Sequence, residues 1–190
     1  MSVAGFVLLG LVVVGVVYFI MLYNGLVQIK HNVSKAWANI DVLLKQRHDE
    51  LPKLVETCKQ YMKYEQDTLE KVMQARAGVA TARETHNIPA LGQAEGALRA
   101  GLGGLFAVAE AYPDLKANDN FQHLQQRISG LENAIADRRE FYNESVNINN
   151  VRIEQFPDVV LANMFGFKPF DLLQFEADEK PDVDVKQLFG

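Results

Sequence analysis

Histidines and carboxylates are the residues with which a helical protein builds a metal site. A di-iron site in a helical bundle needs Glu-x-x-His pairs on facing helices. None of the four histidines (His31, His48, His86 and His123) follows a glutamate by three residues, and neither His-Glu-x-x-His nor a cysteine cluster occurs. The Gly-x-Ser-x-Gly pattern of a nucleophile elbow is also missing. The sequence therefore predicts no catalytic, cofactor-binding or metal-ligating residues.

Charged residues on apolar helix faces are more informative. Arg47 and Glu65 lie on the apolar seam of a long predicted helix, and Arg138, with Arg139 beside it, lies on the seam of a later one. Buried charges are tolerated only when they are paired and hydrogen-bonded. The candidate partners on other faces are Asp41, Glu110 and Glu132. We favour a network that fixes helix register, and the alternatives are a polar groove, an inter-subunit contact or catalysis.

The only cysteine, Cys58, cannot form an internal disulfide. It falls on the same apolar seam as Arg47, where a free thiol behaves as a small hydrophobic side chain. We therefore expect Cys58 to be buried and structural.

Val3 to Leu22 is a run of twenty residues without a charge. In a helix, this length matches the hydrocarbon core of a bilayer, which is about 30 Å thick. A cleaved signal peptide would have a basic start, a shorter apolar run and a small-residue cleavage site, so we expect a retained anchor. Tyr18 and Tyr23 suit the interfacial belt, and Lys30 and Lys35 after the span place the following domain in the cytoplasm by the positive-inside rule.

The stretch from Tyr23 to Val72 predicts one long amphipathic helix. Its seam is Leu26, Lys30, Val33, Trp37, Ile40, Leu44, Arg47, Leu51, Leu54, Cys58, Tyr61, Glu65, Thr68 and Val72. The seam keeps its phase across Pro52, so we expect a kink there and not a break. The helix is expected to fray near Gly78.

A second helix is predicted from Pro89, which suits a first turn, to Pro113. It contains five glycines: Gly92, Gly96, Gly101, Gly103 and Gly104. Close approach of another helix explains them, whereas a phosphate-binding loop would need a preceding strand and a P-loop lysine that the sequence lacks.

A third helix is predicted from Phe121 to about Gln155, after the capping candidates Asn118 and Asp119. A short fourth segment, Asp158 to Met164, ends at Gly166 as a C-terminal cap. The fold class is therefore all-α, with an N-terminal transmembrane helix that continues into an antiparallel bundle of three long helices and a short fourth. In this bundle the first helix rises from the membrane, the second returns and the third rises again.

The C-terminal part carries an aromatic run and an acidic tail. The aromatic run, Phe165 to Phe175, either closes the end of the bundle or presents a patch for a partner or a membrane surface. Residues 171–190 hold a net charge of -4 out of -5 for the whole chain, which predicts a solvated tail. The nearly neutral remainder argues against nucleic acid as a ligand. The predicted divisions are an anchor at 1–24, a bundle domain at 25–170 and the tail.

Several ungapped blocks of the chain together resemble the bacterial LemA family from about Tyr23 to Phe170. The blocks are Tyr23-Asn24, Ala36-Trp37, Ile40-Asp41-Val42, Leu44-Lys45, Arg47-His48, Leu51-Pro52-x-Leu54-Val55-Glu56, Ala109 to Ala117, Phe121, Leu131-Glu132-Asn133, Arg138-Arg139-x-x-Tyr142-Asn143 and Phe156-Pro157. The resemblance implies a single-pass membrane protein with an antiparallel helical bundle, and it supplies no reaction. The matching residues Trp37, Arg47, Tyr112, Arg138 and Tyr142 therefore enter as architecture. The run Asn147 to Asn150 departs from the Tyr-Asn expected there and is read as a surface or packing variation.

These observations lead to a functional expectation. The chain is predicted to be a non-enzymatic, membrane-anchored scaffold of the bacterial envelope, placed in the inner membrane. It would contact the bilayer through Val3–Leu22 and act through a homo-oligomer, coiled-coil contacts or another membrane protein. The alternative is an adaptor for a membrane protease or a signalling protein.

Overall fold

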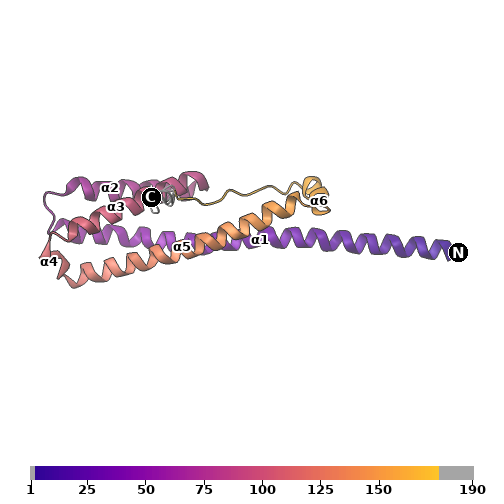
Figure 1. Ribbon diagram of the computed structural model, residues 1–190, viewed down its shortest axis with the longest axis horizontal. Helices are drawn as coiled ribbons and strands as arrows, with labels where there is room; N and C mark the ends of the chain where they lie inside the picture. Colours follow the sequence, from indigo (N-terminus) through magenta and orange to yellow (C-terminus); the bar gives the residue numbers. More distant parts are fainter. Residues whose placement is uncertain (1–2, 176–190) are drawn as a thin grey trace, which may run out of the picture. The chain divides into compact units, whose positions relative to one another are not determined.

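The computed structural model describes residues 3–175, and these residues form six α-helices and no β-strand (Figure 1). The helices are α1 (Val3–Lys59), α2 (Gln66–Glu84), α3 (Ile88–Ala109), α4 (Pro113–Lys116), α5 (Asp119–Glu154) and α6 (Asp158–Phe165). The all-α prediction is confirmed. The predicted acidic tail lies outside the described residues from position 176 onward.

The chain divides into two compact units. Of the described residues, unit 1 comprises 3–38 and 140–171, and unit 2 comprises 39–139 and 172–175. α1 and α5 each contribute to both units.

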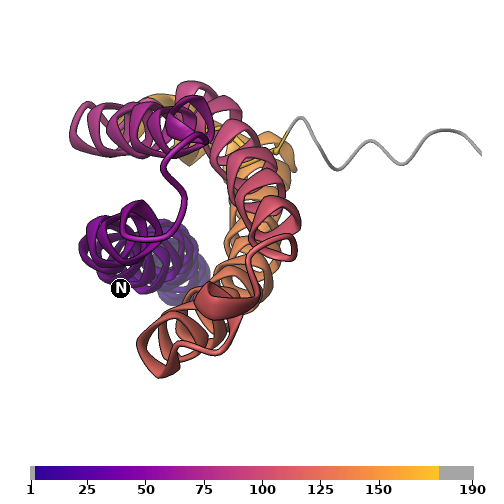
Figure 2. The same cartoon turned by 90° about the vertical axis from the view of Figure 1, so that its left-hand side faces the viewer.

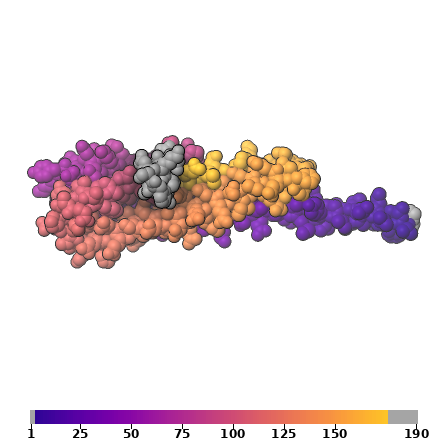
Figure 3. All heavy atoms as spheres, in the orientation of Figure 1, coloured from indigo at the N-terminus to yellow at the C-terminus, as the bar shows by residue number. Residues whose placement is uncertain are grey.

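The first part of α1, in unit 1, is long and apolar enough to cross a membrane. Its large apolar side chains are exposed, as Leu8 (67%) and Leu11 (68%) illustrate, and Figure 3 shows this stretch (indigo) uncovered. Exposure of so much contiguous apolar surface is stable in lipid and not in water. The stretch indicates a membrane protein.

The core of unit 1 lies just after this stretch. Leu26 packs with Ile153, Leu161 and Ala162, and Leu22, Tyr23 and Phe167 cover the cluster. α6 ends at Gly166, whose φ of 71° is a left-handed conformation that glycine adopts readily. The predicted C-terminal cap is confirmed.

Asn150 and Tyr142, in the second half of α5, contact the segment after α6, also in unit 1. The Asn150 side-chain amide donates to the Phe170 carbonyl at 2.9 Å, and its Oδ1 accepts from the Phe170 N–H at 2.9 Å. Tyr142 packs edge-to-face on Trp37 with ring centroids 5.9 Å apart, and its hydroxyl donates to the Asp171 carbonyl at 3.0 Å. Two residues of the predicted Asn147–Asn150 variation, Asn149 and Asn150, thus bind the backbone of the segment after α6.

Unit 2 is a bundle in which α1, α2, α3 and α5 follow one another in alternating direction (Figure 1). α2 and α3 lie side by side, as Figure 2 shows in a view along the helices. The buried apolar residues come from every long helix and include Ile40, Leu54, Val72, Leu98 and Ile128. These side chains recur at three- and four-residue spacings, so each amphipathic helix turns its stripe to a shared core.

The single long helix predicted from Tyr23 to Val72 is wrong beyond Lys59. The chain continues through Pro52 as predicted, but it leaves the helix at Lys59 and begins α2 at Gln66. Met62 and Leu69 are buried, whereas the seam residues Glu65 and Thr68 are only half-buried. A helix that turns back continues the same apolar spacing, because both arms cover one core, and so periodicity did not reveal the turn.

This additional turn also corrects the predicted direction of the last long helix. Arg47 on α1 pairs with Glu132 on α5, and Glu50, three residues later on α1, pairs with Arg127, five residues earlier on α5. α5 therefore runs antiparallel to α1 and not parallel to it. The predicted fraying near Gly78 is also wrong, since α2 extends to Glu84.

The predicted helix starts are confirmed. Asn87 caps α3 by accepting from the Ala90 N–H at 3.0 Å, with Pro89 in the first turn. Asn118 caps α5 by accepting from the Phe121 N–H at 3.0 Å. Each side chain satisfies a backbone donor that has no partner within its helix.

Candidate functional site

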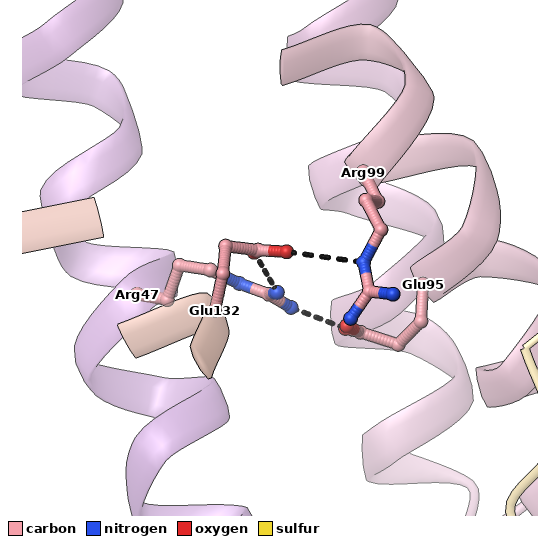
Figure 4. Close-up of polar contacts among 4 residues, drawn as sticks. All are labelled: Arg47, Glu95, Arg99 and Glu132. Carbon is pink, nitrogen blue, oxygen red and sulfur yellow. Dashed lines mark hydrogen bonds and ion pairs between the residues drawn. The ribbon is translucent and has the colours of Figure 1, made fainter. Parts of the chain in front are cut away.

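The most buried polar group of unit 2 is a network of four charged side chains from α1, α3 and α5 (Figure 4). Arg47 on α1 is 1% exposed and binds Glu95 of α3 through Nη2 and Glu132 of α5 through Nη1. Arg99, one turn after Glu95, lies with its Nε 3.5 Å from Glu132 Oε2. One guanidinium thus joins three helices, and we call these four residues the Arg47 network.

Charge balance makes this arrangement stable. Two guanidinium groups face two carboxylates, so no net charge is buried. Burial lowers the pKa of Arg47, but Glu95 and Glu132 together raise it by more than burial lowers it, so the guanidinium stays charged. Burial raises the pKa of Glu95, and Arg47 opposes this effect. Removal of either partner would leave an uncompensated charge in a dry environment, so the network fixes which residues of the three helices meet.

The Arg47 network contacts residues 172–175, which belong to unit 2. Phe175 is 4% exposed, and its ring lies beneath the guanidinium groups of Arg99 (5.2 Å) and Arg139 (4.3 Å). Leu173 is fully buried nearby in the sequence. A cation over an aromatic face is attractive, so Arg99 contributes to the ion pairs and also holds the C-terminal segment.

Glycine at position 92 of α3 permits that segment to approach. A β-carbon added to Gly92 would lie 1.9 Å from the Gln174 carbonyl oxygen. The predicted close approach is therefore correct for Gly92, where the segment 172–175 and not a helix approaches. At Gly101 the neighbour is a helix, as predicted, since an added β-carbon would lie 3.8 Å from the Cα of Val72 on α2. Gly103 and Gly104 face open space, so close packing does not explain them.

A second polar contact joins α1 to α2. Arg76 donates through Nε to the His48 carbonyl at 2.9 Å and through Nη2 to His48 Nε2 at 2.6 Å. A guanidinium has only donors, so Nε2 must accept, and His48 is neutral with its proton on Nδ1. Burial and the Arg76 charge both lower the pKa of His48.

The turn between α1 and α2 borders an open cavity of about 640 Å³. It is lined by Val55, Lys59, Met62, Lys63, Gln66, Leu69, Glu70 and Met73. Lysine and acid side chains surround an apolar floor, and the lining contains no histidine, cysteine or serine. Among residues 3–175, moreover, no group of three histidine, cysteine or acidic side chains is placed to hold a metal ion.

The structure brings together only some of the charged residues singled out from the sequence. Arg47 and Glu132 meet as predicted, whereas Asp41 lies 3.6 Å from Arg83 and Glu110 pairs with Lys116 at the surface. Glu65 lies in the turn before α2.

The placement of Arg138 on a buried seam is wrong. Its side chain is exposed, and the adjacent Arg139 instead covers Phe175. Ile135 and Tyr142, seven residues apart, are both buried, and Arg139, four residues after Ile135, is half-buried between them, so that position 138 faces outward.

Glu95 is the functional residue that sequence reasoning missed. It follows Leu91 by four residues and precedes Leu98 by three, and both leucines are buried. An acidic residue in the middle of an apolar seam was the available indication of a partner for Arg47.

Fold and network together define an all-α protein whose helices are joined by buried ion pairs and whose first helix begins with a membrane-length apolar segment. A family model described as the LemA family matches residues 36–186. The chain belongs to the LemA family, as its sequence blocks predicted.

Individual relatives are also similar. Magnetosome protein MamQ 2 of Paramagnetospirillum magneticum is 33% identical over 96 residues, which cover 50% of this chain and 35% of that protein. Magnetosome protein MamQ of Magnetospirillum gryphiswaldense is 34% identical over 92 residues, which cover 48% and 32%. Protein LemA of Metamycoplasma hominis is 26% identical over 185 residues, which cover 96% and 84%. The matches thus span only about a third of the magnetosome proteins' length.

Proposed function

We propose that this protein is a non-enzymatic, membrane-anchored scaffold that assembles with copies of itself. The first part of α1 anchors it in the bacterial inner membrane, and Lys30 and Lys35 after the apolar segment favour a cytoplasmic position for the bundle. The Arg47 network is buried and balanced, which suits a structural role. The names of the relatives state no reaction.

One observation carries the proposal: α5 has an apolar face that the described residues leave uncovered. Phe141 (50% exposed), Ile148 (49%) and Val151 (43%) lie in the unit 1 part of α5. Their spacings of seven and three residues place them on one side of the helix, and this is the spacing of a coiled-coil seam, in which the exposed Glu144 occupies the position between Phe141 and Ile148. We call these residues the α5 apolar face.

A second copy of the chain is the occupant that this face favours. A seam with heptad spacing packs best against another helix with the same spacing. The anchor also holds every copy in one plane and in one orientation, which raises the effective concentration of the faces. Weak contacts between the α5 apolar faces are then sufficient for assembly.

The first experiment is the particle mass of the full-length protein in mild detergent, beside the fragment 22–190. We expect a discrete assembly of the full-length protein. Retention of the assembly by the fragment would assign the contacts to the bundle, and its loss would show that assembly needs the anchor, either for its own contacts or to concentrate the α5 apolar faces.

A variant tests the α5 apolar face itself. Ile148→Glu with Val151→Glu introduces charges into the seam, so we expect the assembly to dissociate. Ser129→Glu, at an exposed polar position in the unit 2 part of the same helix, is the matched control and should leave the mass unchanged. Monomers of the unaltered full-length protein would refute the scaffold proposal and favour an adaptor for a membrane protease or signalling protein, which crosslinking would then detect.

A further inference from the structure

α6 exposes apolar side chains that the core of unit 1 does not use. Phe156, just before the helix, is 84% exposed, followed by Val160 (50%), Met164 (64%) and Phe165 (48%). Val160 and Met164 are four residues apart, which places them on one face of α6, and Phe156 lies in the turn just before the helix. We call Phe156, Val160 and Met164 the α6 apolar face.

The opposite side of α6 is already packed. Leu161 and Ala162 belong to the buried cluster with Leu26 and Ile153. A short surface helix needs only one apolar side to dock on its core, so the second apolar side requires another environment.

The position of α6 identifies that environment. The Phe165 ring packs edge-to-face against Phe19 (centroids 6.1 Å apart) and Tyr23 (4.8 Å apart). Phe19 and Tyr23 stand at the end of the apolar segment of α1, where a membrane-spanning helix leaves the hydrocarbon core. Phe165 thus places α6 beside the end of the apolar segment, at the height where the lipid–water interface begins.

The charges around this face fit a lipid surface. From Val159 to Phe170 the only charged residue is Lys168, which is exposed. Of the two acids that border this stretch, Asp158 is buried and ion-paired with Arg152 at 2.9 Å, and Asp171 is exposed at its far end. An apolar helix face with a basic residue beside it is the pattern of a segment that lies in the headgroup region of anionic membranes.

We propose that the α6 apolar face inserts into the lipid–water interface beside the anchor. This contact would hold unit 1 against the membrane surface and fix the direction in which α1 leaves it. The inference rests on the anchoring part of the proposed function and does not depend on self-assembly.

The test measures the depth of single fluorescent labels in the full-length protein. The protein is reconstituted in vesicles of phosphatidylcholine and phosphatidylglycerol that carry a nitroxide quencher either near the headgroup or at the chain end. A polarity-sensitive dye is attached to Met164→Cys, Asn147→Cys or Leu11→Cys in a Cys58→Ala background. Leu11 reports on the anchor, and Asn147 is an exposed polar control in unit 1.

At Met164→Cys we expect blue-shifted emission and stronger quenching by the shallow nitroxide than by the deep one, because interfacial helices bury their apolar face about 5–10 Å. Asn147→Cys should show little quenching by either. Leu11→Cys should be quenched most by the deep nitroxide.

Equal quenching of Met164→Cys and Asn147→Cys would overturn the inference. If Leu11→Cys is then still quenched, the anchor stands and only the α6 contact is wrong; if it is not, the anchor is wrong as well. Excimer fluorescence between pyrene labels at Met164→Cys without nitroxide quenching would also overturn it and assign the face to a second copy.

Discussion

At the scale of residues, Arg47 is the side chain on which most of unit 2 depends. It is almost fully buried and joins three helices through two carboxylates. Its role follows from the high free energy of an unpaired buried charge, which makes a mispaired helix arrangement unfavourable.

Arg47→Ala is predicted to lower the free energy of unfolding by about 3–5 kcal/mol, because Glu95, whose pKa burial already raises, loses the cation that stabilises its buried carboxylate. Chemical denaturation in mild detergent measures this difference. Arg138→Ala, which removes an exposed arginine, is the matched control and should change stability by no more than about 0.5 kcal/mol. Equal effects of the two substitutions would contradict the register function of the network.

Burial of the Cys58 thiol predicts that the folded protein loses stability at alkaline pH. Burial raises the pKa of its thiol from 9.0 to about 12. Because the folded pKa is above the unfolded one, the contribution of Cys58 is complete below pH 9 and is lost as the pH rises toward 12, by up to about 4 kcal/mol.

Unfolding of the protein and of Cys58→Ala at several pH values would measure this contribution. We expect a shallower decline for Cys58→Ala between pH 9 and 12. Parallel declines would show that the thiol ionises equally in both states. Thiol reagents should also react with the folded protein only slowly near neutral pH.

Half of the Arg47 network could be predicted from its residues. Arg47 interrupts an apolar seam, so it had to find an acid, and Glu132 was among the candidates. Glu95 was not a candidate, because the glycine-rich sequence of α3 marks its buried face less clearly than the leucine-rich sequence of α1 does. Arg138 was misplaced because the residues three and four positions after a buried one both lie near its face, and the spacing alone did not decide between Arg138 and Arg139.

At the scale of elements, the contact of α3 with the segment 172–175 depends on the absence of one side chain. Gly92→Ala is predicted to destabilise the protein by about 1–3 kcal/mol, because the new methyl group displaces the Gln174 backbone. Chemical denaturation would measure the change.

Gly104→Ala is the matched control in the same helix. Its methyl group enters open space, so helix propensity alone predicts stabilisation of up to about 1 kcal/mol. If both alanines stabilise the protein, the close approach at Gly92 is wrong.

Helix boundaries at prolines and caps were predictable, whereas the turn at 60–65 was not. Asn87, Asn118 and Gly166 act through local hydrogen bonds and backbone conformation, which depend on neighbouring residues only. The turn after Lys59 depends on a core that forms only when α1 and α2 fold back together.

At the scale of the whole molecule, deletion of residues 1–21 separates the anchor from the folded units. The apolar side chains in this stretch are almost all exposed, so the fragment 22–190 should keep the thermal midpoint of the full-length protein. The fragment 25–190 also loses Leu22 and Tyr23, which cover the core of unit 1, and should be less stable by about 2 kcal/mol.

Circular dichroism during heating in one detergent would compare the two fragments. Equal midpoints for both would show that Leu22 and Tyr23 contribute nothing to unit 1. A large loss in 22–190 would show that the apolar segment itself stabilises the fold.

The sequence by itself determined the all-α class, the apolar segment of membrane-spanning length, the helix caps and the family. These properties follow from the composition and spacing of residues along a single stretch of chain, because one helix or one cap depends only on residues that are near in the sequence. Only the tertiary structure decided that Glu95 completes the Arg47 network, that α5 runs antiparallel to α1, and that Gly92 admits the backbone of Gln174. The physical reason is that each of these depends on which residues meet from distant stretches, and many pairings of amphipathic helices bury the same apolar stripes.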